Sequence, residues 1–310
     1  MKRRFFMILI ICMFGLMLVF PKPVFNGASK GLLLWFNVVL PTLLPFIIIS
    51  NLLIRTNAAT LIARITGPLF CRLFSVSGYG SFAVLTGFLC GYPMGSKVTA
   101  DLHNGGYISG EEGRYLLSFC NNTSPMFIIS YVIWQNMKDE SLTLPAIAIL
   151  MAAPILCSFL FRRYYHMSHA AGGRVYHLPA QKAASSSVLD DCIMNGFETI
   201  TKVGGYIMLF SVLISLAQLL PFHHPALMLA GLPSLEITNG ISMLCTSCSE
   251  PGLRFVLAMG LTSFGGWCSV AQTRCMVQEA GFPIFPYIIE KLVTAGVTSL
   301  LAYGYIVLLK

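Results

Sequence analysis

Long apolar runs separated by short polar stretches dominate the chain. Six runs are long enough to cross the hydrocarbon core of a bilayer, which takes about 20 residues of helix. They cover residues 1–20, 31–54, 116–134, 142–161, 203–220 and 285–309. The pattern therefore predicts an all-α polytopic membrane protein with six full spans.

Two further apolar segments are interrupted by residues that break helices. Glycines and a proline crowd residues 87–95 of the segment 79–101, and glycines follow one another at residues 265–266 of the segment 255–275. Broken backbone at membrane depth is tolerated only where protein or a water-filled cavity satisfies the freed N–H and C=O groups. In secondary transporters such interruptions mark the binding site. We therefore predict two broken or re-entrant helices around a polar site.

Two segments combine a helical period with a polar face. Arginines recur at eight- or nine-residue intervals in and beside residues 57–74, which favours a helix lying in the membrane interface. Residues 187–202 are predicted to form an amphipathic helix that leads into the span 203–220. Between the two halves, residues 162–187 form the one long polar loop.

The composition agrees with a membrane location. The 310-residue chain is 56% hydrophobic and 10% charged, with a mean hydropathy of +0.75, whereas soluble domains carry about 25% charged residues. The net charge of +8 does not indicate nucleic-acid binding, because the basic residues stand singly at predicted membrane edges. We expect the lipid bilayer, and no nucleic acid, as a partner.

No motif indicates an enzyme, a metal site or a cofactor. The ten cysteines mostly stand inside apolar runs, where a thiol acts as a small hydrophobic group. One CxxC, Cys245 to Cys248, has no companion ligand motif, so we interpret it as small residues at a helix break, with metal or redox use as the alternative. The sequence has no HExxH, GxSxG, P-loop or dinucleotide-binding motif. An intramembrane enzyme remains the alternative to a non-catalytic protein.

The two interrupted segments align with each other without a gap. Residues 91–92 match 266–267 and residues 106–107 match 281–282, both at an offset of 175 (266 − 91 and 281 − 106). The flanking spans also correspond, 31–54 with 203–220 and 116–134 with 285–309. An odd number of crossings between the copies makes the repeat inverted, which is the architecture of many secondary transporters.

This repeat divides the chain into four parts. They are an N-terminal transmembrane anchor (1–30), a first repeat (31–137), a linking transmembrane helix with a cytoplasmic loop (138–187) and a second repeat (188–310). With a cytoplasmic N-terminus and two re-entrant segments, fourteen Lys and Arg residues fall inside and six outside, namely Lys22, Lys30, Lys138, Arg254, Arg274 and Lys291. This charge balance predicts that both termini are cytoplasmic.

The stretch that interrupts the run 116–134 carries four polar side chains, Asn121, Asn122, Thr123 and Ser124. We predict that they bind the polar face of a solute, or a cation through carbonyl oxygens. The alternative is that they only satisfy backbone groups freed by Pro125. Four polar groups are more than one proline needs, which favours binding.

Glu236 is the carboxylate that we predict to lie inside the membrane, and Thr238 and Asn239 follow it. An ionisable group at such depth is by default a functional hypothesis, so we predict a solute contact and a coupling site for H⁺ or Na⁺. The alternative is an interfacial carboxylate at the end of a loop, since Pro233 and Ser234 stand just before it.

Backbone exposed at the interruptions completes the predicted site, together with one amide from the second segment. These residues are Gly91, Gly95, Gly265, Gly266 and Gln272. The alternative for the glycines is structural, because glycine breaks helices and lets backbones approach closely. Lys97 and Asp101, at i and i+4, are expected to pair on one helix face. A contact between Lys97 and an anionic substrate is the alternative.

The longest conspicuous motif resembles a known family. Residues 87–102 read GFLCGYPMGSKVTADL and residues 108–125 read ISGEEGRYLLSFCNNTSP, and both closely resemble the sporulation integral membrane protein YlbJ family of endospore-forming bacteria. Residues 235–240 (LEITNG) and 263–272 (SFGGWCSVAQ) match its second half more loosely. The resemblance implies a Gate, or nucleoside-recognition, domain in each repeat, distantly shared with concentrative nucleoside transporters. It also implies a role in spore cortex formation or maturation.

Pattern and resemblance together predict a membrane protein needed for spore formation that acts as a transporter or channel for a small polar solute. Its expected partners are that solute, a coupled H⁺ or Na⁺, and a second copy of the chain in a homo-oligomer. The alternative is a membrane scaffold that recruits cortex-assembly partners without transport. The expected location is the cell membrane, in the mother-cell-derived membrane around the forespore.

Overall fold

The computed structural model describes residues 2–56, 58–167, 187–219 and 227–309, and every regular element in these ranges is helical. The first half contains α1 (Lys2–Val19), α2 (Pro21–Leu34), the π-helix η1 (Trp35–Val39), α3 (Leu40–Arg55), α4 (Ala59–Phe74), α5 (Gly78–Leu89), α6 (Met94–Asn104), α7 (Gly110–Cys120), α8 (Pro125–Phe127), the π-helix η2 (Ile128–Met137), the 3₁₀ turn η3 (Glu140–Leu142) and α9 (Thr143–Tyr164). The second half contains α10 (Ser187–Ala217), the π-helix η5 (Leu227–Gly231), α11 (Ile237–Ser247), α12 (Pro251–Phe264), α13 (Gly266–Val277) and α14 (Ile284–Leu309). The predicted all-α class is confirmed.

Six helical runs in the described residues are long and apolar enough to cross a membrane. They are Pro21–Arg55, Gly110–Met137, Glu140–Tyr164, Val188–Ala217, Pro251–Val277 and Ile284–Leu308. The helices α4 and α5, whose axes meet at 88°, make a further bent candidate. The protein is therefore a multi-pass integral membrane protein.

Two local predictions are changed by the structure. Residues 187–217 form the single helix α10 of 31 residues, not a short amphipathic helix followed by a separate span. The second interrupted segment is a broken helix rather than a re-entrant one, because α12 and α13 continue as one run of 27 residues. Most of the polar loop 162–187 lies outside the described residues.

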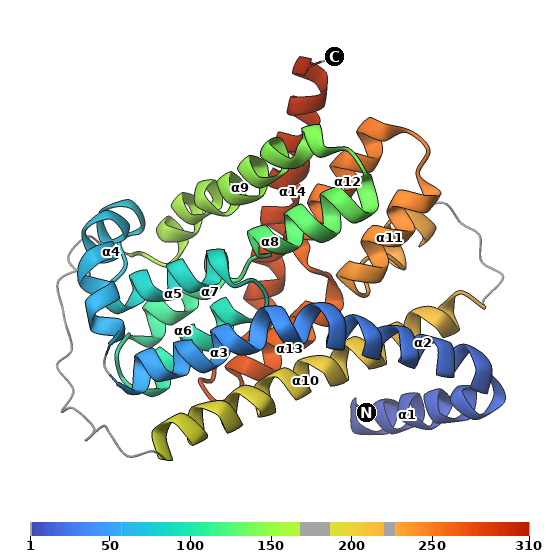
Figure 1. Cartoon of the computed structure of the whole chain (residues 1–310), viewed down its shortest axis with the longest axis horizontal. Helices are drawn as coiled ribbons and strands as arrows, with labels where there is room; N and C mark the ends of the chain where they lie inside the picture. The colour runs from blue at the N-terminus through green and yellow to red at the C-terminus, as the bar shows by residue number, and fades with distance from the viewer. Residues whose placement is uncertain (1, 57, 168–186, 220–226, 310) are drawn as a thin grey trace.

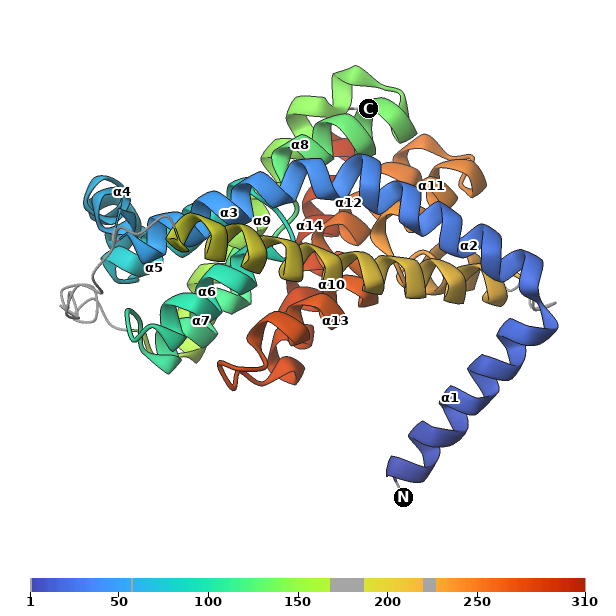
Figure 2. The same ribbon diagram turned by 60° about the horizontal axis from the view of Figure 1, so that its bottom comes forward.

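The run α2–η1–α3 and the helix α10 form an antiparallel pair along one side of the molecule (Figures 1 and 2). The Trp35 indole donates to the Ile200 carbonyl at 2.9 Å, and the Asn51 amide donates to the Asn195 side chain at 2.9 Å. As the residue number rises along α2–α3, the number of the contacting residue in α10 falls, so the two helices run antiparallel. In Figure 2, α1 extends away from this pair.

The same order of elements occurs in both halves of the chain. Each half has a first span, a short helix, a span interrupted half-way and a final span, although α4 and α5 stand before the short helix in the first half. The short helix α6 corresponds to α11 at an offset of 143 (237 − 94 and 247 − 104). The remaining equivalences are α7 with α12, α8–η2 with α13, and α9 with α14.

Contacts between the halves follow this correspondence. The helix α6 contacts α13, and its counterpart α11 contacts η2, which corresponds to α13. In the same way α7 contacts α9 and α14, and its counterpart α12 contacts α14 and α9. The predicted offset of 175 pairs α6 with α13 instead of α11, so the order of elements favours the offset of 143. The counterparts α3 and α10 run antiparallel, as an inverted repeat requires.

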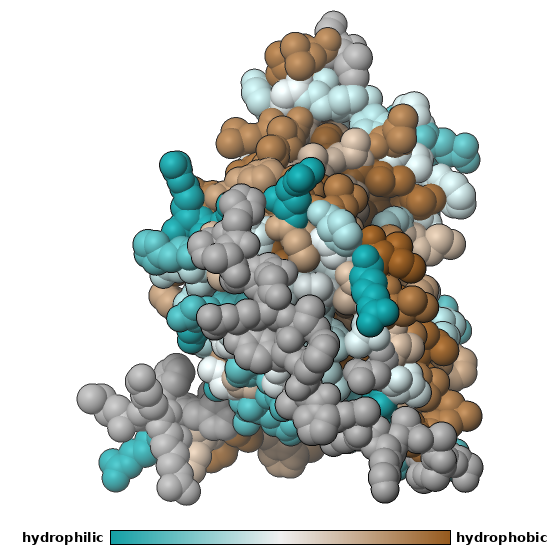
Figure 3. Space-filling view, turned by 90° about the vertical axis from the view of Figure 1, so that its left-hand side faces the viewer, coloured by the Kyte–Doolittle hydropathy of each residue, from teal (hydrophilic) through white to brown (hydrophobic). Residues whose placement is uncertain are grey.

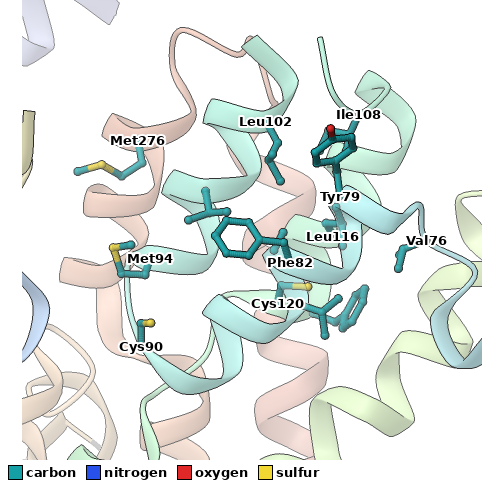
Figure 4. Close-up of a cluster of buried hydrophobic side chains, with 14 of the residues drawn as sticks. Val76, Tyr79, Phe82, Cys90, Met94, Leu102, Ile108, Leu116, Cys120 and Met276 are labelled. Atoms are coloured by element: carbon teal, nitrogen blue, oxygen red, sulfur yellow. The ribbon is translucent and has the colours of Figure 1, made fainter. Parts of the chain in front are cut away.

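The interrupted helices of the first half pack around a buried apolar cluster. Figure 4 shows Phe82 of α5 between Met94 of α6 and Leu116 of α7, with Cys120 below them at the end of α7. Met276 of α13 lies beside the same cluster. This packing fixes where the breaks that follow α5 and α7 lie.

Large apolar side chains cover much of the outer surface. Figure 3 shows hydrophobic residues over the top and the right-hand edge of one face, with hydrophilic residues in separate groups. Examples from the helices are Leu61, Ile65 and Leu69 of α4, Leu144 and Leu160 of α9, and Leu292 and Leu300 of α14. Soluble monomers rarely expose contiguous apolar surface of this kind, so it is typical of contact with lipid.

Substitutions of two adjacent glycines of α10 can test how this helix packs against Trp35. A Cβ at Gly204 would lie 2.6 Å from the Trp35 indole nitrogen, whereas a Cβ at Gly205 would meet nothing within 4 Å. Alanine favours a helix interior over glycine by up to about 1 kcal/mol. We therefore expect Gly205→Ala to keep or raise the thermal unfolding temperature in detergent and Gly204→Ala to lower it, since Trp35 must move. Equal effects would contradict this packing.

Candidate functional site

Four interruptions of the helical backbone lie in the interior. They are residues 90–93 between α5 and α6, 121–124 between α7 and α8, 232–236 before α11, and Gly265 between α12 and α13. The second and fourth stand at the middle of their candidate spans, since (110 + 137)/2 is about 123 and (251 + 277)/2 is 264. A span crossing the bilayer would place these breaks near its centre.

Each half of the chain binds backbone groups that the other half leaves free. The Tyr92 hydroxyl donates to the Ser263 carbonyl at 2.7 Å, and the Thr123 hydroxyl donates to the Thr262 carbonyl at 2.7 Å. In the opposite direction, the Lys291 ammonium donates to the Asn121 carbonyl at 3.0 Å. The carbonyls at the ends of α12 and α7, which lack intrahelical donors, are thus satisfied across the interface.

Glycine is required where the breaks approach one another. Gly265 has a φ of +81°, and a Cβ there would lie 2.8 Å from the Tyr92 ring. A Cβ at Gly95 would lie 2.4 Å from the Cys120 carbonyl oxygen. Gly91 and Gly266 also have positive φ values, of +89° and +81°. The structure thus gives all four predicted glycines a backbone reason to be glycine.

A cavity of about 90 Å³ lies among the four breaks. Its polar wall comes from the breaks, and its apolar wall comes from η1, α3 and α10, including Val39, Leu43, Val203 and Ile207. One water needs about 10–15 Å³ of such volume, so the cavity has room for several waters or a small solute.

The cavity separates the predicted site residues into two groups. Those that line it are Gly91, Thr123, Ser124, Glu236, Thr238, Gly265 and Gln272. Those that do not are Gly95, Asn121, Asn122, Asn239 and Gly266. Seven of the twelve predicted residues therefore line the cavity, and the other five are engaged in contacts between helices.

Among the described residues that line the cavity, Gln272 has a side chain with hydrogen-bonding capacity to spare. Its side chain is buried, and the contact made by its amide nitrogen is with the Cys268 sulfur at 3.2 Å. A carboxamide offers two donors and an acceptor oxygen. Most of this capacity is therefore left for a ligand in the cavity.

Glu236 lines the cavity, but its carboxylate is held by its own helix. It caps the N-terminus of α11, accepting bonds from the backbone N–H groups of Thr238 at 3.0 Å and Asn239 at 2.9 Å. The Thr238 hydroxyl and the Asn239 amide, the latter at 2.8 Å, also donate to it. Four donors at the start of a helix thus occupy both oxygens of this carboxylate.

Asn121 and Asn122 connect α7 to the second half. The Asn121 amide donates to the hydroxyls of Thr273 and Tyr287, both at 2.8 Å. Asn122 donates to the Phe119 carbonyl at 2.7 Å, while its side-chain oxygen accepts from Lys291 at 3.4 Å. These amides position the break in α7.

Sequence reasoning missed Lys291 as a site residue. The charge count placed it outside the membrane, yet its side chain is 1% exposed and lies seven residues into α14. Its nitrogen is also 5.0 Å from the centre of the Tyr92 ring. An ionisable residue within an apolar span was the available signal. Its neighbour Glu290 accepts a bond from the Tyr165 hydroxyl at 2.5 Å instead.

Two other expectations concern charged and metal-binding groups. Lys97 and Asp101 pair at 2.6 Å, as their spacing predicts. Within the ranges that the structure describes, no group of three His, Cys, Asp or Glu side chains is placed to hold a metal ion.

Comparison with known proteins shows a relative of this chain. The chain is 27% identical to the sporulation integral membrane protein YlbJ of Bacillus subtilis (strain 168), in a 305-residue alignment that covers 88% of this chain and 75% of the relative. No family model and no solved structure matches the chain. The alignment covers most of both proteins and confirms the resemblance to the YlbJ family. The Gate-domain relation stays a prediction.

Two glutamate caps test the role of Glu236. Glu250 caps α12 in the same way but is exposed, so water can replace its lost bonds. In Glu236→Gln an amide NH₂ replaces one acceptor oxygen among buried donors, which costs about 1–3 kcal/mol of unfolding free energy. We expect Glu250→Gln to cost less. Equal stability losses in thermal unfolding would contradict the buried cap.

Proposed function

We propose that this relative of YlbJ transports a small polar solute across the membrane during sporulation. The observation that carries the proposal is the cavity at the meeting point of four helix breaks. Irregular backbone at membrane depth is tolerated where it lines a cavity. Discontinuous helices around a central site, in inverted repeats, are typical of secondary transporters.

The cavity suits a small solute with both an apolar and a polar face. Val203 and Ile207 of α10 offer apolar contact on one side. On the other side are Gln272 and Thr123, together with the backbone of Gly91. Ligand sites generally combine an apolar lining with a few polar groups that orient the ligand.

The role in sporulation rests on the name of the similar protein. By that similarity we place the protein in the mother-cell-derived membrane around the forespore, with both termini in the cytoplasm, where it contributes to cortex formation or maturation. Gate-type nucleoside recognition belongs to the same proposal, as does assembly into a homo-oligomer. The alternative is a membrane scaffold that recruits cortex-assembly partners.

Solute binding can be tested on the purified full-length protein in detergent. We expect at least one compound from a panel of nucleosides, nucleobases, amino acids and small carboxylic acids to raise the unfolding temperature, because ligands that bind only the folded state stabilise it. Gln272→Ala should abolish that increase. The exposed Gln278, at the end of the same helix α13, supplies the control variant Gln278→Ala, which should keep it.

Uptake of the stabilising compound by proteoliposomes then separates transport from binding. Wild-type protein and Gln278→Ala should accumulate it, and Gln272→Ala should not. A panel without any stabilising compound, or proteoliposomes that take none up, would favour the scaffold and contradict transport.

A further inference from the structure

We propose that the Lys291 ammonium is a built-in cation of this site, occupying the end of α7 where a transporter that uses sodium would bind the free ion. The proposal deepens the proposed transport function and rests on it. Its consequence is that the protein requires no sodium.

The surroundings of Lys291 are those of a bound cation. A lysine ammonium has three N–H donors. Here it meets three uncharged groups, which are the Asn121 carbonyl at 3.0 Å, the Asn122 amide oxygen at 3.4 Å and the Tyr92 ring at 5.0 Å. Within the described residues no carboxylate lies within 4 Å of it.

The position at the end of a broken helix explains how the charge is tolerated. Helix α7 ends at Cys120, and Asn121, whose carbonyl Lys291 binds, is the residue that caps this end. Such ends carry partial negative charge and favour cations. Unwound carbonyls and the C-terminal ends of half-helices are also the groups that coordinate Na⁺ or H⁺ in secondary transporters. Lys291 of α14 reaches this place from the opposite half.

Three buried carboxylates of the described residues could otherwise attract a free cation, and all are engaged elsewhere; one of them, Glu112, accepts the Ser77 backbone N–H at 2.5 Å. Glu236 is bound by four donors at the start of α11. Glu290 accepts the Tyr165 hydroxyl at the end of α9. The proposal therefore puts a positive charge at Lys291, whereas the sequence hypothesis placed an ion at Glu236.

Tyr92 connects the ammonium to the cavity. It lines the cavity, one face of its ring meets Lys291, and its hydroxyl binds the Ser263 carbonyl. The ammonium itself does not line the cavity. A tethered cation in this place keeps the breaks of both halves together and cannot leave with the solute, so movement of the solute is not coupled to a sodium gradient.

The test compares cations by thermal unfolding of the full chain in detergent. Wild type, Lys291→Ala and the control Lys97→Ala are measured in sodium, choline and methylammonium chloride at equal ionic strength. Lys97 forms an ordinary helix pair with Asp101 at 2.6 Å. We expect wild type and Lys97→Ala to unfold at the same temperature in all three salts. Lys291→Ala should unfold earlier in choline and recover in methylammonium or sodium, which fit the vacated position.

Specific outcomes decide the proposal. Recovery of Lys291→Ala by a small cation but not by choline supports a cation site. Wild-type protein that is more stable in sodium than in choline overturns it, as does a Lys291→Ala variant that no cation stabilises. If Lys291→Ala does not fold, Lys291→Ser replaces it, because serine opens the same space and adds a hydroxyl ligand. If neither variant folds, the comparison of wild-type stability in sodium and in choline decides. A solute panel in which no compound raises the unfolding temperature would contradict transport, but it would not change the outcome of the cation comparison.

Discussion

Backbone groups that a broken helix exposes inside a membrane must find partners within the protein, and the rest of this structure depends on that requirement. Lipid offers no hydrogen bonds, and each unsatisfied group costs several kcal/mol. The chain meets the requirement reciprocally. Tyr92 and Thr123 of the first half bind carbonyls at the end of α12, and Lys291 of the second half binds a carbonyl at the end of α7. Either half alone would leave some of these backbone carbonyls without a donor.

This reciprocity explains why a cavity and a structural network lie side by side. Polar groups brought in to satisfy backbone form the network of Asn121, Asn122 and Lys291. Where the breaks cannot close completely against each other, the remaining space is the cavity, lined by Thr123, Gln272 and glycine backbone. Residues of all four breaks line this cavity. A ligand bound there would therefore depend on how the two halves are arranged.

The sequence predicts the helix breaks well because their cause is local. Glycine, proline and runs of polar residues interrupt helices wherever they occur, and the breaks at residues 90–93, 121–124 and 265 follow from that. The register of the repeat was not predictable in this way, since the offset of 143 depends on the order of elements rather than on identical residues. Lys291 was missed because its partner Asn121 is 170 residues away. The capping role of Glu236 was missed because the start of α11 had to be known first.

Cross-linking of Thr123→Cys with Thr262→Cys tests the meeting of the two halves most directly. The Thr123 hydroxyl lies 2.7 Å from the Thr262 carbonyl, so the introduced thiols should be within reach of a short bifunctional methanethiosulfonate cross-linker in a cysteine-free background. A protease site inserted between residues 167 and 187 allows the two halves to be cleaved apart. We expect the cross-linked halves to stay joined on a non-reducing gel after this cleavage. The exposed Ser141 paired as Ser141→Cys with Thr262→Cys should leave them separate. Separation of the Thr123–Thr262 pair under the same conditions would contradict the convergence of the breaks.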